Sequence, residues 1–111
     1  MHKRITFRNM ERSAVMKNYI EQQLTKIEEF LDHERSPIYI DLVLEPSKNH
    51  AHHRVELRVK SANYDLISNY EREGVGFYDV VDRVIDVMYD QLREAKRKRV
   101  DDRKGPSISE I

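Results

Sequence analysis

The sequence GFYDVVDRVIDVMYDQLREAKRKR, residues 76–99, decides how the rest of the chain is organised. At about 100° per residue, its apolar side chains fall on one side of a helix, opposite a stripe of carboxylates. The apolar side contains Phe77, Val81, Val84, Ile85, Met88, Leu92 and Ala95. The acidic stripe contains Asp79, Asp82, Asp86, Asp90 and Glu94. The stretch therefore predicts an amphipathic helix with one buried face.

The C-terminal end of this predicted helix is strongly basic. Residues 93–104 include seven Lys or Arg and three Asp or Glu, a net charge of +4. The whole chain has 20 basic and 20 acidic residues, so it lacks the overall basic excess that is typical of nucleic-acid binders. Cations suit this position because the helix macrodipole is negative there. From the residues alone, the basic run is either an RNA contact or an ordinary solvated helix end.

Patterns upstream of residue 76 predict the remaining elements. Residues 3–8, 38–45, 54–60 and 64–71 alternate apolar and polar side chains, as half-buried strands do, although the last is the least regular. Residues 61–63 form a connection of hairpin length. Residues 13–32 predict a helix that Ser13 can cap. Its apolar face contains Met16, Ile20, Leu24, Ile27 and Leu31.

The resulting order, β-α-β-β-β-α, predicts an α+β fold. We expect a two-layer sandwich in which a four-stranded sheet carries two helices on one face. The first two strands can pair in parallel because a helix connects them, and the later strands can form an antiparallel meander. With 111 residues, we expect a single domain at residues 1–104 and a flexible tail at 105–111 that contains Gly105 and Pro106.

Several classes of protein do not fit the composition. The chain has no Cys, which rules out disulfides and thiolate metal sites and suits a reducing compartment. No apolar run approaches the roughly 18 residues that cross a membrane, and the N-terminus lacks the apolar stretch of a signal peptide. Nucleophile motifs and Gly-rich phosphate loops are also missing from the sequence. We therefore expect a cytoplasmic protein without enzymatic activity, cofactor or small-molecule substrate.

Three other groups of side chains have both a functional and a structural interpretation. His50, His52 and His53 could ligate a metal ion, but neighbouring strand residues point to opposite faces, so we favour a surface loop. The acidic stripe is better explained as a solvated face than as a cation site, with Arg83 pairing to Asp79 and Asp86 and Arg93 to Asp90. Stacking on RNA bases is possible for four tyrosines, but packing at the core margin is the better account. They are Tyr64, Tyr70, Tyr78 and Tyr89.

Several segments resemble one known family. Residues 13–32, SAVMKNYIEQQLTKIEEFLD, resemble the first helix of the bacterial ribosome hibernation-promoting factors, also called ribosome-associated inhibitor or sigma-54 modulation proteins. FYDVVD, residues 77–82, is similar to the family's Met-Tyr-x-x-Ile-Asp helix start, and Gln91 and Leu92 precede spaced lysines as in the family. HRVE, residues 53–56, is similar to its third-strand start. The resemblance covers about residues 3–100 and, without the second dimerising domain of long members, indicates a short form.

The resemblance implies a fold like that of double-stranded RNA-binding domains. It further implies a translation inhibitor that binds the small ribosomal subunit near the tRNA and mRNA sites during stress or stationary phase. The residues that would contact ribosomal RNA are Lys17, Lys26, Arg93, Lys96 and Lys98. Family members often carry Lys or Arg at four positions that are neutral or acidic here, namely Gln23, Val87, Asp90 and Glu94.

Two further expectations accompany this interpretation. Asp82 matches a family position at the start of the last helix, which implies a structural or capping role. The alternative function is a protein-binding regulatory module on the same scaffold, not bound to RNA. Its contact surface would be a small apolar patch of Val80 and Val87 beside Lys98.

Overall fold

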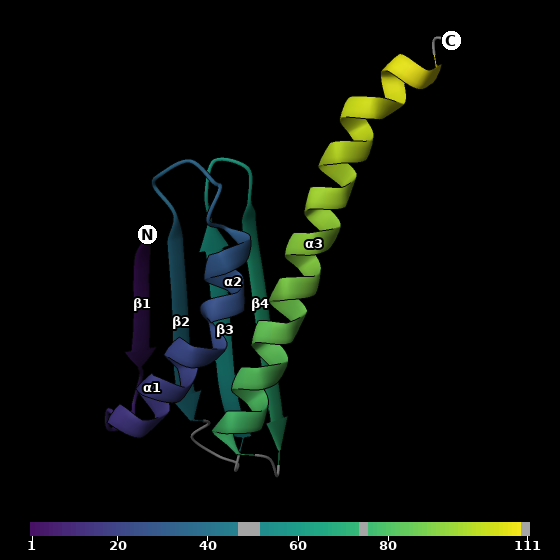
Figure 1. Cartoon of the computed structure of the whole chain (residues 1–111). Helices are drawn as coiled ribbons and strands as arrows, with labels where there is room; N and C mark the ends of the chain where they lie inside the picture. The colour runs from purple at the N-terminus through teal and green to yellow at the C-terminus, as the bar shows by residue number, and fades with distance from the viewer. Residues whose placement is uncertain (47–51, 74–75, 110–111) are drawn as a thin grey trace.

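A computed structural model describes residues 1–46, 52–73 and 76–109, with backbone alone at residues 52, 73 and 101–109. In chain order the elements are β1 (His2–Phe7), α1 (Ala14–Gln23), α2 (Thr25–Phe30), β2 (Tyr39–Pro46), β3 (His52–Lys60), β4 (Asp65–Glu73) and α3 (Phe77–Ser109). The strands form one sheet in the order β1-β2-β3-β4, with the helices in a second layer (Figure 1). The predicted α+β sandwich is confirmed. None of the described helices is long and apolar enough to span a membrane.

The sheet combines one parallel and two antiparallel pairings. β1 pairs with β2 in parallel, whereas β2–β3 and β3–β4 are antiparallel, as the sequence predicts. A row of opposed residues crosses the sheet on its covered face, running from Ile5 through Leu42 and Leu57 to Ser68. Ser68 is a buried polar residue in this row, and its hydroxyl donates to the backbone oxygen of Val84 in α3 at 3.0 Å. That bond ties α3 to β4 at a defined position.

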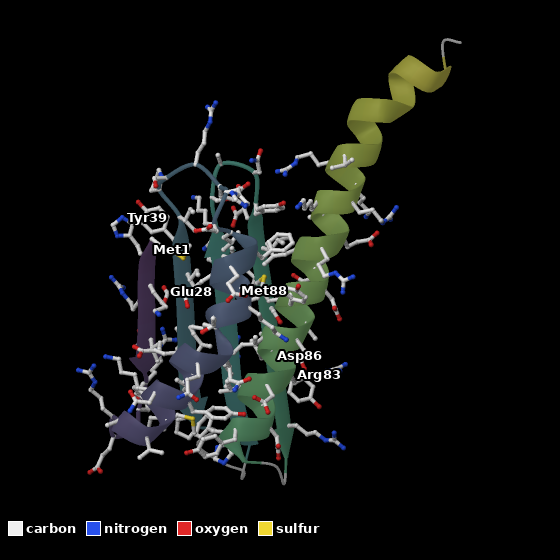
Figure 2. The ribbon with its side chains drawn as sticks, in the orientation of Figure 1. Met1, Glu28, Tyr39, Arg83, Asp86 and Met88 are labelled. Carbon is white, nitrogen blue, oxygen red and sulfur yellow. The ribbon has the colours of Figure 1, made fainter. Side chains whose placement is uncertain are left out.

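The core lies between the sheet and the helices. All five predicted apolar residues of the first helix are buried, and so are the inward-facing residues of β2 and β3. Met88 of α3 is fully buried and lies in this layer (Figure 2). Val80, which the sequence placed in an exposed patch, is 0% exposed, because the buried face of α3 is wider at its first turn than the predicted stripe. The proposed patch therefore loses one of its two apolar members.

The predicted helix at residues 13–32 is divided into α1 and α2 at Leu24. Ser13 caps α1 as predicted, its hydroxyl accepting from the backbone amide of Met16 at 3.1 Å. The Thr25 hydroxyl donates to the backbone oxygen of Glu21 at 3.3 Å, an arrangement that often bends helices. As a result α1 crosses the end of the sheet while α2 runs along the strands (Figure 1).

α3 is longer than the sequence predicts. The helical backbone continues to Ser109, beyond residue 99 where the predicted helix ends. Its C-terminal part projects past the sheet (Figure 1). The expected flexibility of residues 105–111 stays a prediction.

A hydrogen bond between Tyr19 and Asp82 joins α1 to α3. The Tyr19 hydroxyl donates to Asp82 Oδ1 at 2.5 Å, and the Tyr78 ring makes an edge contact with the Tyr19 ring at a centroid distance of 4.8 Å. The bond to Asp82, together with burial, raises the pKa of Tyr19 to about 12. Asp82 thus has a structural partner in the first helix.

We predict that Tyr19→Phe lowers the free energy of unfolding by about 1 kcal/mol near neutral pH, because Asp82 loses its donor. The pKa of Tyr19 is raised above its ordinary value of 10.0, so the folded state holds this proton more tightly than the unfolded state. The contribution of the Tyr19–Asp82 hydrogen bond to the free energy of unfolding is therefore complete below the pKa of Tyr19 in the unfolded state. It is lost as pH rises through about 12.

Denaturant unfolding of both proteins near pH 8 and near pH 11 measures this difference. The difference in free energy of unfolding between wild type and Tyr19→Phe should be smaller at the higher pH. Tyr39→Phe, at a tyrosine that is 47% exposed, is the control and should match wild type near pH 8. An unchanged difference at the two pH values would contradict the assigned role of the Tyr19 proton.

Candidate RNA-binding surface

Three aromatic side chains form a row between α2, α3 and the β3–β4 hairpin. Phe30, at the end of α2, lies between Tyr89 of α3 and Tyr64 of the hairpin. The centroid of its ring is 6.0 Å from the ring centroid of each tyrosine. The rings meet at 76° and 57°, within the tilted and edge-on orientations that aromatic pairs favour. Tyr64 is buried, while Phe30 and Tyr89 are half-buried and present part of their surface to solvent.

Four cations lie over these rings, and together with them form what we call the cation–aromatic row. The distances to ring centroids are 5.1 Å for Lys26 Nζ and 5.7 Å for Arg93 Cζ over Tyr89, 5.5 Å for Lys96 Nζ over Phe30, and 5.1 Å for Arg99 Cζ over Tyr64. Cations within about 6 Å of a ring centroid are attracted by the negative face of the ring. Long basic side chains are thereby held along one side of α3.

Helical spacing explains why these residues meet. Tyr89, Arg93 and Lys96 follow one another at intervals of four and three, so they share one flank of α3. Lys26 and Phe30 are four apart and share a flank of α2. The two flanks face each other, and a groove of about 390 Å³ opens beside Phe30, Tyr89, Arg93 and Lys96.

The structure gathers three of the five predicted RNA-contacting residues. Lys26, Arg93 and Lys96 belong to the cation–aromatic row. Lys17 is half-buried on α1, separated from Lys26 by the bend at Leu24. Lys98 lies on the other flank of α3.

That other flank faces β4 and forms a second depression, which we call the α3–β4 groove. It measures about 450 Å³, and its lining includes Leu66, Ala95 and Lys98. Three of the positions at which the sequence lacks a familial basic residue also line it, namely Val87, Asp90 and Glu94. The α2 side of α3 therefore presents Arg93 and Lys96, whereas the β4 side combines apolar residues with two carboxylates and one cation, Lys98.

The acidic stripe is largely a solvated face. Asp86 forms an ion pair with Lys26 across the two helices, so the predicted pairing of Asp86 with Arg83 is wrong. Both partners are exposed, and such pairs contribute little to stability. Among the described residues, no ion pair joins Arg83 to Asp79 or Arg93 to Asp90. The guanidinium of Arg93 lies over the Tyr89 ring instead. Arg97 donates to Glu94, and this hydrogen bond lowers the pKa of the Glu94 carboxyl.

The remaining predictions concern the tyrosines and histidines. Packing is confirmed for Tyr64, Tyr70 and Tyr89, but Tyr78 is 42% exposed. The His53 ring stacks on Phe77 at a centroid distance of 4.0 Å, and His50 lies outside the described residues. In the part of the chain that the structure describes, no three His, Asp or Glu side chains lie where they could hold a metal ion.

Sequence reasoning missed two members of the row, Phe30 and Arg99. A signal for Phe30 was present, since it lies four residues after Lys26 on the same helical flank. Arg99 appeared only as one member of the basic run. Its contact with Tyr64 depends on how the hairpin approaches α3, which no spacing within one helix reveals.

Comparison with known proteins places the chain in a family. A family model described as sigma-54 modulation protein / S30EA ribosomal protein matches residues 4–100. A ribosomal subunit interface protein from Coxiella burnetii superposes with a TM-score of 0.72 at 21% identity, covering 87% of this chain and 99% of that one. The N-terminal domain of Thermus thermophilus Protein Y gives a TM-score of 0.65 at 21% identity, covering 85% and 98%.

At these identities the two structures establish a shared fold. A comparison with curated protein sequences finds no match. The family model, however, spans nearly all of the described chain and includes both helical flanks of the cation–aromatic row. The chain therefore belongs to the sigma-54 modulation protein / S30EA ribosomal protein family.

Proposed function

We propose that the protein binds the small ribosomal subunit near the tRNA and mRNA sites and inhibits translation in stress or stationary phase. It would act by occupying an RNA surface, without catalysis. Membership of a family named for a ribosomal protein supports ribosome association. The single observation that carries the proposal is the cation–aromatic row, which concentrates positive charge on one side of a chain of zero net charge.

The chemistry of the row suits structured RNA. Folded RNA is recognised largely through its shape, its phosphates and its 2′-hydroxyls, so cations at fixed positions matter more than base-reading groups. Contact with Tyr89 and Phe30 restricts the side chains of Lys26, Arg93 and Lys96 before RNA arrives. Less conformational entropy is then lost when phosphates bind.

Charge on the other flank of α3 limits how RNA can approach. Asp90 and Glu94 are exposed and line the α3–β4 groove. Their carboxylates would repel a phosphate backbone on that side. We therefore place the main RNA contact on Lys26, Arg93 and Lys96, with Lys17 and Lys98 at its margins.

The α3–β4 groove favours a second candidate function, that of a protein-binding regulatory module. Leu66, Val87 and Ala95 give the groove an apolar lining. Recovery of partners from lysate before and after nuclease treatment distinguishes the two functions. Partners that survive nuclease would favour the module, and partners lost with RNA favour the ribosome.

We predict that the purified protein co-sediments with small ribosomal subunits and that binding weakens steeply with salt. Phosphate contacts release bound counterions, so affinity should fall about ten-fold or more between 50 and 200 mM monovalent salt. Sedimentation at several salt concentrations measures this. Protein that stays out of the ribosomal fractions even at the lowest salt would refute the proposal.

We predict that Lys96→Glu weakens this binding by about ten-fold or more, because it reverses a charge within the row. Arg83→Glu is the matched control, since Arg83 is an exposed cation of the same helix on the side away from α2 (Figure 2). It makes the same change in net charge. Equal losses for the two variants would mean that only overall charge, and not the row, governs binding.

A further inference from the structure

A separate cavity lies where the end of α2, the β3–β4 hairpin and α3 come together. It measures about 470 Å³, and we call it the hairpin pocket. Its lining includes the cations Arg35, Lys96 and Arg99, and the segment from His33 to Arg35 closes one side. Lys96 lines both this pocket and the groove beside Tyr89, whereas Arg99 lines the hairpin pocket and not that groove.

The carboxylate in the lining is already engaged by the hairpin. Glu34 Oε1 accepts from the Ser61 hydroxyl at 2.8 Å, and the Asn63 side-chain amide donates to both Glu34 oxygens at 3.2 Å. No ion pair joins Glu34 to Arg99 or Lys96 among the described residues. The lining therefore carries three cations against the single carboxylate of Glu34, whose oxygens are turned to the hairpin.

Arg99 has the least satisfied side chain in this cluster. Its guanidinium lies over the Tyr64 ring, and Nε and Nη1 are buried with no hydrogen-bond acceptor among the described side chains. A buried charged donor without an acceptor costs free energy, so such groups in folded proteins usually have an ion or ligand as partner. Burial raises the pKa of the Tyr64 hydroxyl, whereas the positive charge of Arg99 and a hydrogen bond from its side chain act in the opposite direction.

We propose that the hairpin pocket binds a phosphate group, with Arg99 as the principal donor and Lys96 and Arg35 as supporting cations. Phosphate offers several acceptor oxygens to donors that converge from different elements, and guanidinium and ammonium groups are its usual partners. The volume lies within the range of small-molecule sites. The phosphate belongs either to a small phosphate compound or to an RNA backbone. The proposal does not depend on ribosome binding.

Titration of the intact, isotopically labelled protein with pyrophosphate, followed by NMR, tests this site. We expect saturable shifts of the Asn63, Tyr64 and Arg99 amides, and affinity at least ten-fold weaker in Arg99→Gln because a charge-assisted hydrogen bond is lost. Arg83→Gln, on the exposed side of the same helix, is the control and should bind as wild type. Arg99→Lys keeps the charge without the guanidinium and should fall between wild type and Arg99→Gln.

Competition identifies the source of the phosphate. Displacement of pyrophosphate by a short single-stranded RNA without terminal phosphates would assign the pocket to an RNA backbone, and failure to displace would assign it to a small phosphate compound. Absence of shifts at these amides up to about 10 mM pyrophosphate would overturn the proposal, since this corresponds to an affinity too weak to be specific. Equal affinity of wild type and Arg99→Gln would also overturn it, while sedimentation of the wild-type protein with ribosomes tests the proposed function separately.

Discussion

The attachment of α3 to the sheet is the constraint on which the rest of the structure depends. Val84, Met88 and Leu92 are fully buried between the helix and the strands, and each such side chain contributes on the order of 1.5–3 kcal/mol when removed from water. The bond from Ser68 to the backbone oxygen of Val84 fixes the helix along its axis as well. The core sets both the rotation and the position of α3. This orientation determines which of its side chains face α2 and which face β4.

That rotation separates charge around a single helix. Side chains turned toward α2 are the cations and aromatic rings of the cation–aromatic row, while those turned toward β4 are apolar residues together with Asp90, Glu94 and one cation, Lys98. The net charge of zero therefore conceals two flanks of different character. A surface of this kind can attract RNA from one direction and repel it from another, so that electrostatics determines orientation in addition to affinity.

Much of the fold could be predicted from the sequence because local periodicity and burial agree. The alternation in β2 and β3 and the spacing from Met16 to Leu31 correspond to residues that are buried in the structure. Failures arose where side chains of different elements meet. Val80 is buried because the first turn of α3 is enclosed more widely than one stripe suggests, and Asp86 pairs with Lys26 across two helices although Arg83 was the nearer partner in sequence. The site followed the same rule: most of the basic residues and two of the three aromatic rings, Tyr64 and Tyr89, were visible in the sequence, but their contacts across elements through Phe30 were not.

The bend at Leu24 links the fold to the site. Thr25 bonds back to the Glu21 carbonyl, and α2 then runs along the strands beside α3 while α1 crosses the end of the sheet (Figure 1). This direction places Phe30 between Tyr89 and Tyr64, where it lines both the groove of Arg93 and the hairpin pocket of Arg99. Phe30 of α2 consequently lies beneath Lys96 of α3, with the Lys96 Nζ atom 5.5 Å from the ring centroid. The departure from a continuous helix is thus the feature that brings cations of α2 and α3 onto one surface.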